Sequence, residues 1–121
     1  MKRVNLTFKL WISVDNEPVV GPGGLAILEA IEKHGSIAKA SKSIGMSYRF
    51  IWGYLRRVED LLGLKIAIKK RGGVKGGGTM LTHEGKLIVS FYKRANQELK
   101  TICENLSEEL NLKLKGELNV T

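Results

Sequence analysis

The residues best suited to bind a ligand lie on one side of a segment near the middle of the chain. Within residues 47–62, aromatic rings and guanidinium groups recur at helical spacing around a glycine: Tyr48, Arg49, Trp52, Gly53 and Arg56. Guanidinium groups donate hydrogen bonds to phosphates and guanine edges, and aromatic rings supply apolar contact with sugars and thymine methyl groups. The combination is typical of a surface that binds nucleic acid.

A second group of cations follows in a glycine-rich stretch. Its members are Lys69, Lys70, Arg71 and Lys75. Glycine lets a backbone approach a ligand closely, and lysine and arginine contact phosphates without reading sequence. A nucleotide-binding GxxxxGK[ST] motif is not formed, because Gly72 and Gly77 have the spacing but Gly78 stands where the lysine belongs.

The net charge of the chain is concentrated around these two groups. The 121 residues carry a formal charge of +8, and residues 36–80 contain ten basic residues and two acidic ones, while the remainder is balanced. This segregation predicts a localised anion-binding surface. The length allows one domain with a modest core.

Three helices are expected to position the aromatic and basic residues. A first helix begins after Gly24 and ends at Gly35, and its apolar residues recur three positions apart. Ser36 is a favourable N-cap for a short second helix that stops before Gly45, and Ser47 caps a third helix. The third helix runs to about residue 62 and carries an apolar stripe for the core: Ile51, Leu55, Val58 and Leu62.

Short strands are expected on both sides of the helices. Residues 4–14 alternate apolar and polar, which predicts a half-buried strand that ends at the turn-forming Asp15 and Asn16. Its apolar side would consist of Val4, Leu6, Phe8, Leu10, Ile12 and Val14. Ile66 and Ile68, with residues 79–81, predict a hairpin whose long basic tip occupies residues 69–79.

One long helix is expected from the N-cap Thr82 to about Leu112. At 1.5 Å per residue it would be roughly 45 Å long, more than so small a domain can cover, which favours a homodimer. In the alternative, its first half packs on its own domain and its second half frays. Residues 113–121 would form a short strand or a tail. The dimer seam would have a heptad rhythm: Ile88, Tyr92, Ala95, Leu99, Ile102 and Leu106.

The order of elements predicts a winged helix-turn-helix, mostly α with a small β wing. Residues 1–81 would form the DNA-binding domain and residues 82–112 the dimerisation helix. The third helix would enter the major groove, where Arg49 and Arg56 bond guanine edges or phosphates. The wing cations would contact phosphates or the minor groove, and backbone amides near Ser36 and Ser47 would donate to phosphates.

Three functional classes compete for this fold. The sequence favours a dimeric, sequence-specific regulator that binds duplex DNA, over a low-specificity architectural protein or a protein-interaction module. An enzyme is not expected, because the sequence holds no paired carboxylates, activated nucleophile or cofactor motif. One cysteine, Cys103, and two distant histidines predict neither a metal site nor a cofactor. Without an apolar run long enough for a membrane span or a signal peptide, a cytoplasmic location is expected.

Several motifs together resemble the N-terminal winged-helix domain of ModE-type molybdate-dependent transcriptional regulators, which is related to the LysR-type DNA-binding domain. The resemblance covers roughly residues 5–110. It implies a DNA-binding regulator that dimerises through its first and last helices, with base contacts at Tyr48, Arg49, Trp52 and Arg56 and wing contacts at Arg71 and Lys75. The likeness rests on Leu28–Ile31, Gly35–Ile37, Gly45–Tyr48, Trp52, Gly72–Gly73, Gly76–Gly78, Leu81–Thr82 and Gly85.

The chain departs from this family after the long helix. Full-length members carry molybdate-binding domains there, and the nine residues that follow Leu112 are too few for such a domain. We therefore expect residues 1–121 not to bind molybdate.

Overall fold

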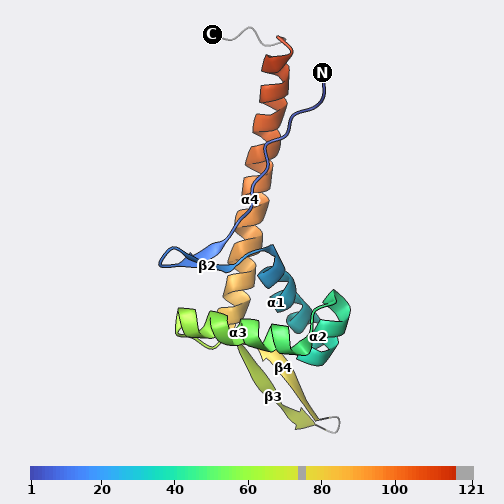
Figure 1. Cartoon of the computed structure of the whole chain (residues 1–121), viewed down its shortest axis with the longest axis vertical. Helices are drawn as coiled ribbons and strands as arrows, with labels where there is room; N and C mark the ends of the chain where they lie inside the picture. The colour runs from blue at the N-terminus through green and yellow to red at the C-terminus, as the bar shows by residue number, and fades with distance from the viewer. Residues whose placement is uncertain (74–75, 117–121) are drawn as a thin grey trace. The chain divides into compact units, whose positions relative to one another are not determined.

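The part of the chain that the structure describes is mostly helical and contains two small antiparallel sheets. The structure, a computed structural model, describes residues 1–73 and 76–116. Figure 1 shows the elements, and their order confirms the predicted winged helix-turn-helix with a long C-terminal helix. They are β1 (Ile12–Val14), β2 (Glu17–Val20), α1 (Pro22–His34), α2 (Ile37–Ile44), α3 (Tyr48–Leu62), β3 (Ala67–Gly73), β4 (Gly76–Leu81) and α4 (His83–Leu114).

The chain divides into two compact units. The core unit comprises Leu10–Tyr92, and the arm unit comprises Met1–Lys9 with the chain from Lys93 onward. The division falls inside α4, so the first turns of this helix belong to the core unit.

Serine caps and glycines set the bounds of the three helices before the wing. The Ser36 hydroxyl accepts a hydrogen bond from the Lys39 amide at 3.0 Å, and the Ser47 hydroxyl accepts one from the Phe50 amide at 3.0 Å. Both caps are confirmed, as are the helix ends at three glycines with left-handed backbones, a conformation that costs glycine little. These are Gly35, Gly45 and Gly63.

One apolar core holds the core unit together. Leu28 and Ile31 of α1 are fully buried, and so is Ile66 at the base of the wing. The stripe expected on α3 is confirmed, since Ile51, Leu55 and Val58 are buried and Leu62 is half-buried. Burying a side chain of this size stabilises a fold by about 1.5–3 kcal/mol, so the stripe fixes which side of α3 faces solvent.

The wing is a hairpin of two strands, and they are longer than predicted. β3 pairs with β4 from Ala67 opposite Leu81 out to Gly73 opposite Gly76. The sequence interpretation assigned these glycines to a loose tip, but a glycine backbone can pair across a hairpin like any other backbone. Residues 74 and 75 lie outside the described part. At the base, the Thr79 amide donates to the Gly35 carbonyl at 2.8 Å and ties the wing to the end of α1.

The predicted strand over residues 4–14 is correct only for its last three residues. β1 pairs with β2 in a hairpin whose turn, Asp15 and Asn16, has two positive φ angles, as a type I′ turn requires. Within the described residues, 4–11 belong to no strand. Val4, Leu6 and Phe8 are 38–42% exposed and not half-buried. The physical reason is that their segment bonds to helix side chains and not to a neighbouring strand.

In the arm unit, residues 1–9 run beside the later turns of α4 (Figure 1). The Val4 amide donates to Asn111 Oδ1 at 2.9 Å, and Asn111 Nδ2 donates back to the Val4 carbonyl at 2.6 Å. The Leu6 amide donates to Ser107 Oγ at 2.8 Å. We call residues 1–9 the arm. The side chains of Ser107 and Asn111 thus satisfy backbone groups of the arm that no strand pairs.

The start of α4 is confirmed, and its end lies slightly later than expected. The Thr82 hydroxyl accepts a hydrogen bond from the Gly85 amide at 3.0 Å, which is the predicted N-cap. The helix ends at Leu114 and not at Leu112. The expected tail therefore begins within the helix, and its residues 117–121 lie outside the described part of the chain.

Candidate nucleic-acid interface

Helix α3 presents different chemistry on each of its sides. The side with Ile51, Leu55 and Val58 lies in the core. The opposite side carries Tyr48, which is 52% exposed, and Trp52, which is 47% exposed. Because the stripe already anchors α3, these aromatic residues are not needed for the core, and they remain available to a ligand.

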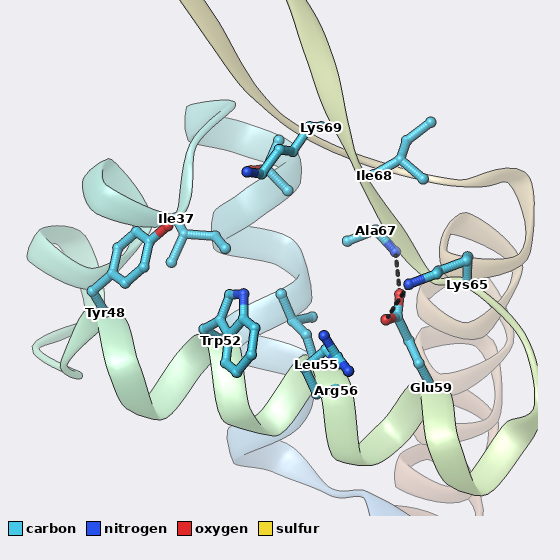
Figure 2. Close-up of a pocket in the computed structure, with 11 residues that line it drawn as sticks. Ile37, Tyr48, Trp52, Leu55, Arg56, Glu59, Lys65, Ala67, Ile68 and Lys69 are labelled. Atoms are coloured by element: carbon cyan, nitrogen blue, oxygen red, sulfur yellow. Dashed lines mark hydrogen bonds and ion pairs between the residues drawn. The ribbon is translucent and has the colours of Figure 1, made fainter.

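A groove of about 320 Å³ lies between α3 and the wing. Figure 2 shows Tyr48 and Trp52 rising from α3 on one side of it, with Lys69 of β3 on the other. The Tyr48 ring lies beside Ile37 at the start of α2. The groove combines apolar walls with lysine and arginine side chains, a surface suited to sugars and phosphates.

Arg56 is held in place by an aromatic neighbour. Its guanidinium carbon lies 5.1 Å from the centroid of the Trp52 ring. Such cation–π contact stabilises an exposed pair by about 0.5–1 kcal/mol and leaves the guanidinium edges free to donate hydrogen bonds. The arrangement orients Arg56 before any ligand arrives.

The predicted cations are exposed and lie on both α3 and β3. Lys69, Lys70 and Arg71 are exposed on β3, as Arg49 and Arg56 are on α3. In the described part of the chain, none of these five residues forms an ion pair with a carboxylate. Their positive charge is therefore not neutralised internally. Lys75 lies outside the described residues.

Ser36 and Ser47 act as helix caps. Each hydroxyl oxygen accepts a hydrogen bond from the amide of the residue three positions later, so both serine side chains are already hydrogen-bonded within the protein. The preceding first-turn amides, at residues 37–38 and 48–49, have no partner within a helix, as at any helix start. Such amides bind phosphate oxygens well. Gly53 lies on the same exposed side of α3 and places no Cβ there.

Three residues around α3 were missed by the sequence interpretation. Phe50 is 58% exposed and borders a second hollow with Arg49 and Gly53. Its exposure could have been predicted from the sequence, because Phe50 does not belong to the apolar stripe that faces the core. Glu59 and Lys65, which border the main groove, form an ion pair at 3.5 Å. An acid inside a basic segment was the available signal for Glu59.

Tyr54 lies on the side of α3 that faces β2. Its hydroxyl donates to the Val19 carbonyl at 3.0 Å. Burial raises the pKa of Tyr54 to about 12, against the opposing influence of the Arg57 charge. Arg57 itself pairs with Glu17 at 3.1 Å. This side of α3 is thus bonded to the first hairpin.

The residues predicted for the dimer seam fall into two groups. Tyr92 lies in the core unit, 3% exposed, and its hydroxyl donates to the Leu10 carbonyl at 3.0 Å. Burial raises the pKa of this phenol as well. Ile88 of the core unit is half-buried, and so are Ala95 and Leu99 of the arm unit. In the arm unit, Ile102 and Leu106 are 52% and 48% exposed.

Over residues 1–73 and 76–116, no cluster of three or more His, Cys, Asp or Glu side chains is arranged to hold a metal ion. None of the helices in these ranges has the length and apolar character needed to cross a membrane.

Comparison with known proteins gives a family and a fold. Residues 23–86 match the bacterial regulatory helix-turn-helix proteins of the lysR family. A solved structure, the BenM_DBD/benA site 1 DNA complex, superposes with a TM-score of 0.51 over 72% of this chain and 91% of that chain, at 15% identity. At that identity the likeness concerns the fold alone.

Curated relatives share the same region. The molybdenum transport protein ModE of Azotobacter vinelandii is 35% identical over 94 residues, which are 78% of this chain and 35% of that protein. The DNA-binding transcriptional dual regulator ModE of Escherichia coli (strain K12) is 26% identical over 107 residues, 88% of this chain and 41% of that protein. The chain spans about a third of the length of the first curated relatives it matches.

Proposed function

The chain belongs to the lysR family of bacterial regulatory helix-turn-helix proteins, and we propose that it regulates transcription by binding duplex DNA sequence-specifically as a homodimer. The observation that carries the proposal is the two-sided helix α3. It buries its apolar stripe and exposes Tyr48, Trp52 and two arginines beside a basic wing. A recognition helix needs this division, because one side must hold the fold while the other enters a major groove about 12 Å wide.

Base readout is assigned to the exposed side of α3. Arg49 and Arg56 donate to guanine edges, and the stacking of Arg56 on Trp52 limits the directions it can take. Tyr48 and Trp52 contact thymine methyl groups or the sugar backbone, and Gly53 allows close approach. The wing cations Lys69, Lys70, Arg71 and Lys75, with the amides near Ser36 and Ser47, contact phosphates and supply affinity without sequence information.

The homodimer is proposed from the apolar surface of the arm unit. Ile102 and Leu106 on α4 and Leu6 and Phe8 on the arm are all more than a third exposed. A second copy of the same surface would cover them with two-fold symmetry. The operator would then be pseudo-palindromic, with half-sites one helical turn apart, about 34–36 Å.

Two finer expectations accompany the proposal. A cytoplasmic location follows from chromosomal DNA as the partner. The expectation that residues 1–121 bind no molybdate stays a prediction, and isothermal titration calorimetry with molybdate tests it directly. A submicromolar dissociation constant would contradict it.

The proposal is tested by selecting retained sequences from a pool of genomic duplex fragments at two salt concentrations. We expect palindromic fragments to be enriched at the higher salt. Uniform retention with a steep salt dependence would indicate an architectural protein, and loss of all retention would favour a protein-interaction module.

Matched variants separate base readout from charge. Arg49→Ala should weaken the selected site by about 1–3 kcal/mol more than random DNA. Arg94→Ala removes the same charge from the arm unit, where Arg94 pairs with Glu98, and should affect both DNAs little. Equal losses on both DNAs for Arg49→Ala would remove this residue from base readout.

A further inference from the structure

One carboxylate lies inside the basic surface and is almost removed from solvent. The Glu59 side chain is 9% exposed, although it stands in the last turns of α3 beside the groove in Figure 2. Burying a carboxylate is costly unless hydrogen bonds and charges compensate it. Its neighbour Asp60 is exposed, as acids on helices usually are.

The compensation for Glu59 comes from the first residues of the wing. Its Oε2 accepts hydrogen bonds from the Ile66 amide at 2.9 Å and from the Ala67 amide at 3.3 Å. Its Oε1 lies 3.5 Å from the ammonium group of Lys65. Figure 2 shows the side chain reaching from α3 to the strand. One residue of the recognition helix therefore bonds three consecutive residues where the wing begins.

These contacts occur at the point that sets the direction of the wing. After α3 the chain passes through Gly63, whose φ of +70° turns it, and β3 begins at Ala67. On the far side of the hairpin base, the Thr82 amide donates to the Ile66 carbonyl at 3.0 Å. Ile66 is thus held through its amide by α3 and through its carbonyl by the residue that caps α4.

We propose that Glu59 is a positioning residue that fixes the direction in which the wing leaves α3, so that the side chains of α3 and the wing cations engage one duplex together. The inference rests on the proposed function for its DNA consequence. The claim that Glu59 holds the start of the wing concerns the DNA-free protein alone. A charge-assisted hydrogen bond is short and directional, which suits it to hold an angle between two elements.

A purely electrostatic role makes the opposite prediction for DNA. Removing a negative charge beside a basic groove should tighten DNA binding, because one repulsion is lost. Loss of the wing's direction should weaken it. Asp60→Asn is the matched control, since it removes the same charge from the adjacent, exposed residue of the same helix.

The first experiment measures amide hydrogen exchange in the DNA-free protein by NMR. We expect Glu59→Ala to accelerate exchange at Ile66 and Ala67 by about tenfold or more, as expected when amides lose their acceptor. Glu59→Gln keeps a carbonyl acceptor and should give an intermediate rate, while Asp60→Asn should match the wild type. If Glu59→Ala fails to fold, the comparison of Glu59→Gln with Asp60→Asn carries the test. Wild-type exchange rates in both Glu59 variants would overturn the proposal.

The second experiment is a double-mutant cycle on the selected DNA. In the wild-type background, Lys69→Ala with Arg71→Ala should weaken binding by about tenfold, and in the Glu59→Gln background by only about twofold. The slope of log affinity against log salt concentration is negative, and its magnitude should decrease by about one to two in Glu59→Gln because fewer phosphates are contacted. Tighter binding in Glu59→Gln, or equal wing effects in both backgrounds, would overturn the positioning role. A wild-type protein that binds no DNA would instead refute the proposed function, and the exchange experiment would still decide whether Glu59 holds the wing.

Discussion

The core unit and the arm unit are held together by different chemistry. The core unit has buried apolar side chains from every helix it contains, among them Leu28 and Ile51. In the described residues of the arm unit, the buried side chains are polar, Ser107 and Asn111, while Ile102 and Leu106 are about half exposed. The core unit packs its buried apolar side chains against one another. The arm unit leaves its apolar side chains exposed, as the proposed dimer interface requires.

The largest effect is expected from shortening a core side chain. Leu28→Ala should lower the free energy of unfolding by about 2–5 kcal/mol, because Leu28 is fully buried and its loss leaves a cavity. Urea unfolding followed by circular dichroism measures it. Leu106→Ala is the matched truncation in the arm unit. An equal cost for Leu106→Ala at protein concentrations where the wild type is monomeric would erase the contrast between the units.

Polar substitutions on the exposed apolar surface should act on assembly. Ile102→Ser with Leu106→Ser should raise the dissociation constant of the proposed dimer by about a hundredfold, roughly 3 kcal/mol, because two apolar side chains lose their cover. Sedimentation velocity over a concentration series measures this. Glu104→Ser, at an exposed position of the same helix, should leave the dimer intact. A double serine variant that dimerises like the wild type would place the interface elsewhere.

Removing the side chain that holds the arm should free the arm alone. Asn111→Ala deletes both hydrogen bonds to Val4, at a local cost of about 1–3 kcal/mol. Limited proteolysis should then cut within residues 1–9 sooner, while the melting of the core unit changes little. Ser107→Ala, which releases only the Leu6 amide, should have a weaker effect. Equal protease resistance in all three proteins would show that these bonds do not hold the arm.

The smallest effect concerns high pH and the core unit. Burial raises the pKa of Tyr54 to about 12, above the ordinary value of 10.0. The unfolded chain therefore releases this proton first, so the stabilisation is complete below pH 10 and is lost as the pH rises toward 12. Tyr54 is partly exposed, so we expect about 1 kcal/mol or less. Denaturant unfolding at several pH values should show a shallower decline for Tyr54→Phe. Identical slopes would contradict the assignment.

Local signals made the helices predictable. The caps Ser36, Ser47 and Thr82 act within three residues of themselves, and Gly35, Gly45 and Gly63 end helices through their own backbone angles. The helical spacing of apolar residues and the cap residues at each end are therefore enough to predict where these helices lie. The exposed side of α3 was predictable for the same reason, because its core stripe assigns the remaining positions to solvent.

Bonds between distant residues were not predictable. An extended arm and a strand share the same alternation, so the period of residues 4–8 did not distinguish them. Their actual partners, Ser107 and Asn111, lie about a hundred positions away and look like ordinary polar residues of a long helix. Glu59 was missed likewise, because nothing near it in the sequence shows that its carboxylate accepts amides at the start of β3.

The pairing of the arm with Asn111 also orders events during synthesis. The arm is made before the rest of the described chain, and Asn111, the partner of Val4, follows 107 positions later. The core unit is complete in sequence by Tyr92, well before that partner is made. Folding of the helix-turn-helix can therefore precede docking of the arm, and a chain truncated before Asn111 would keep α3 and the wing while the arm stays unattached. The arm can therefore dock fully only after nearly the whole of α4 has been synthesised.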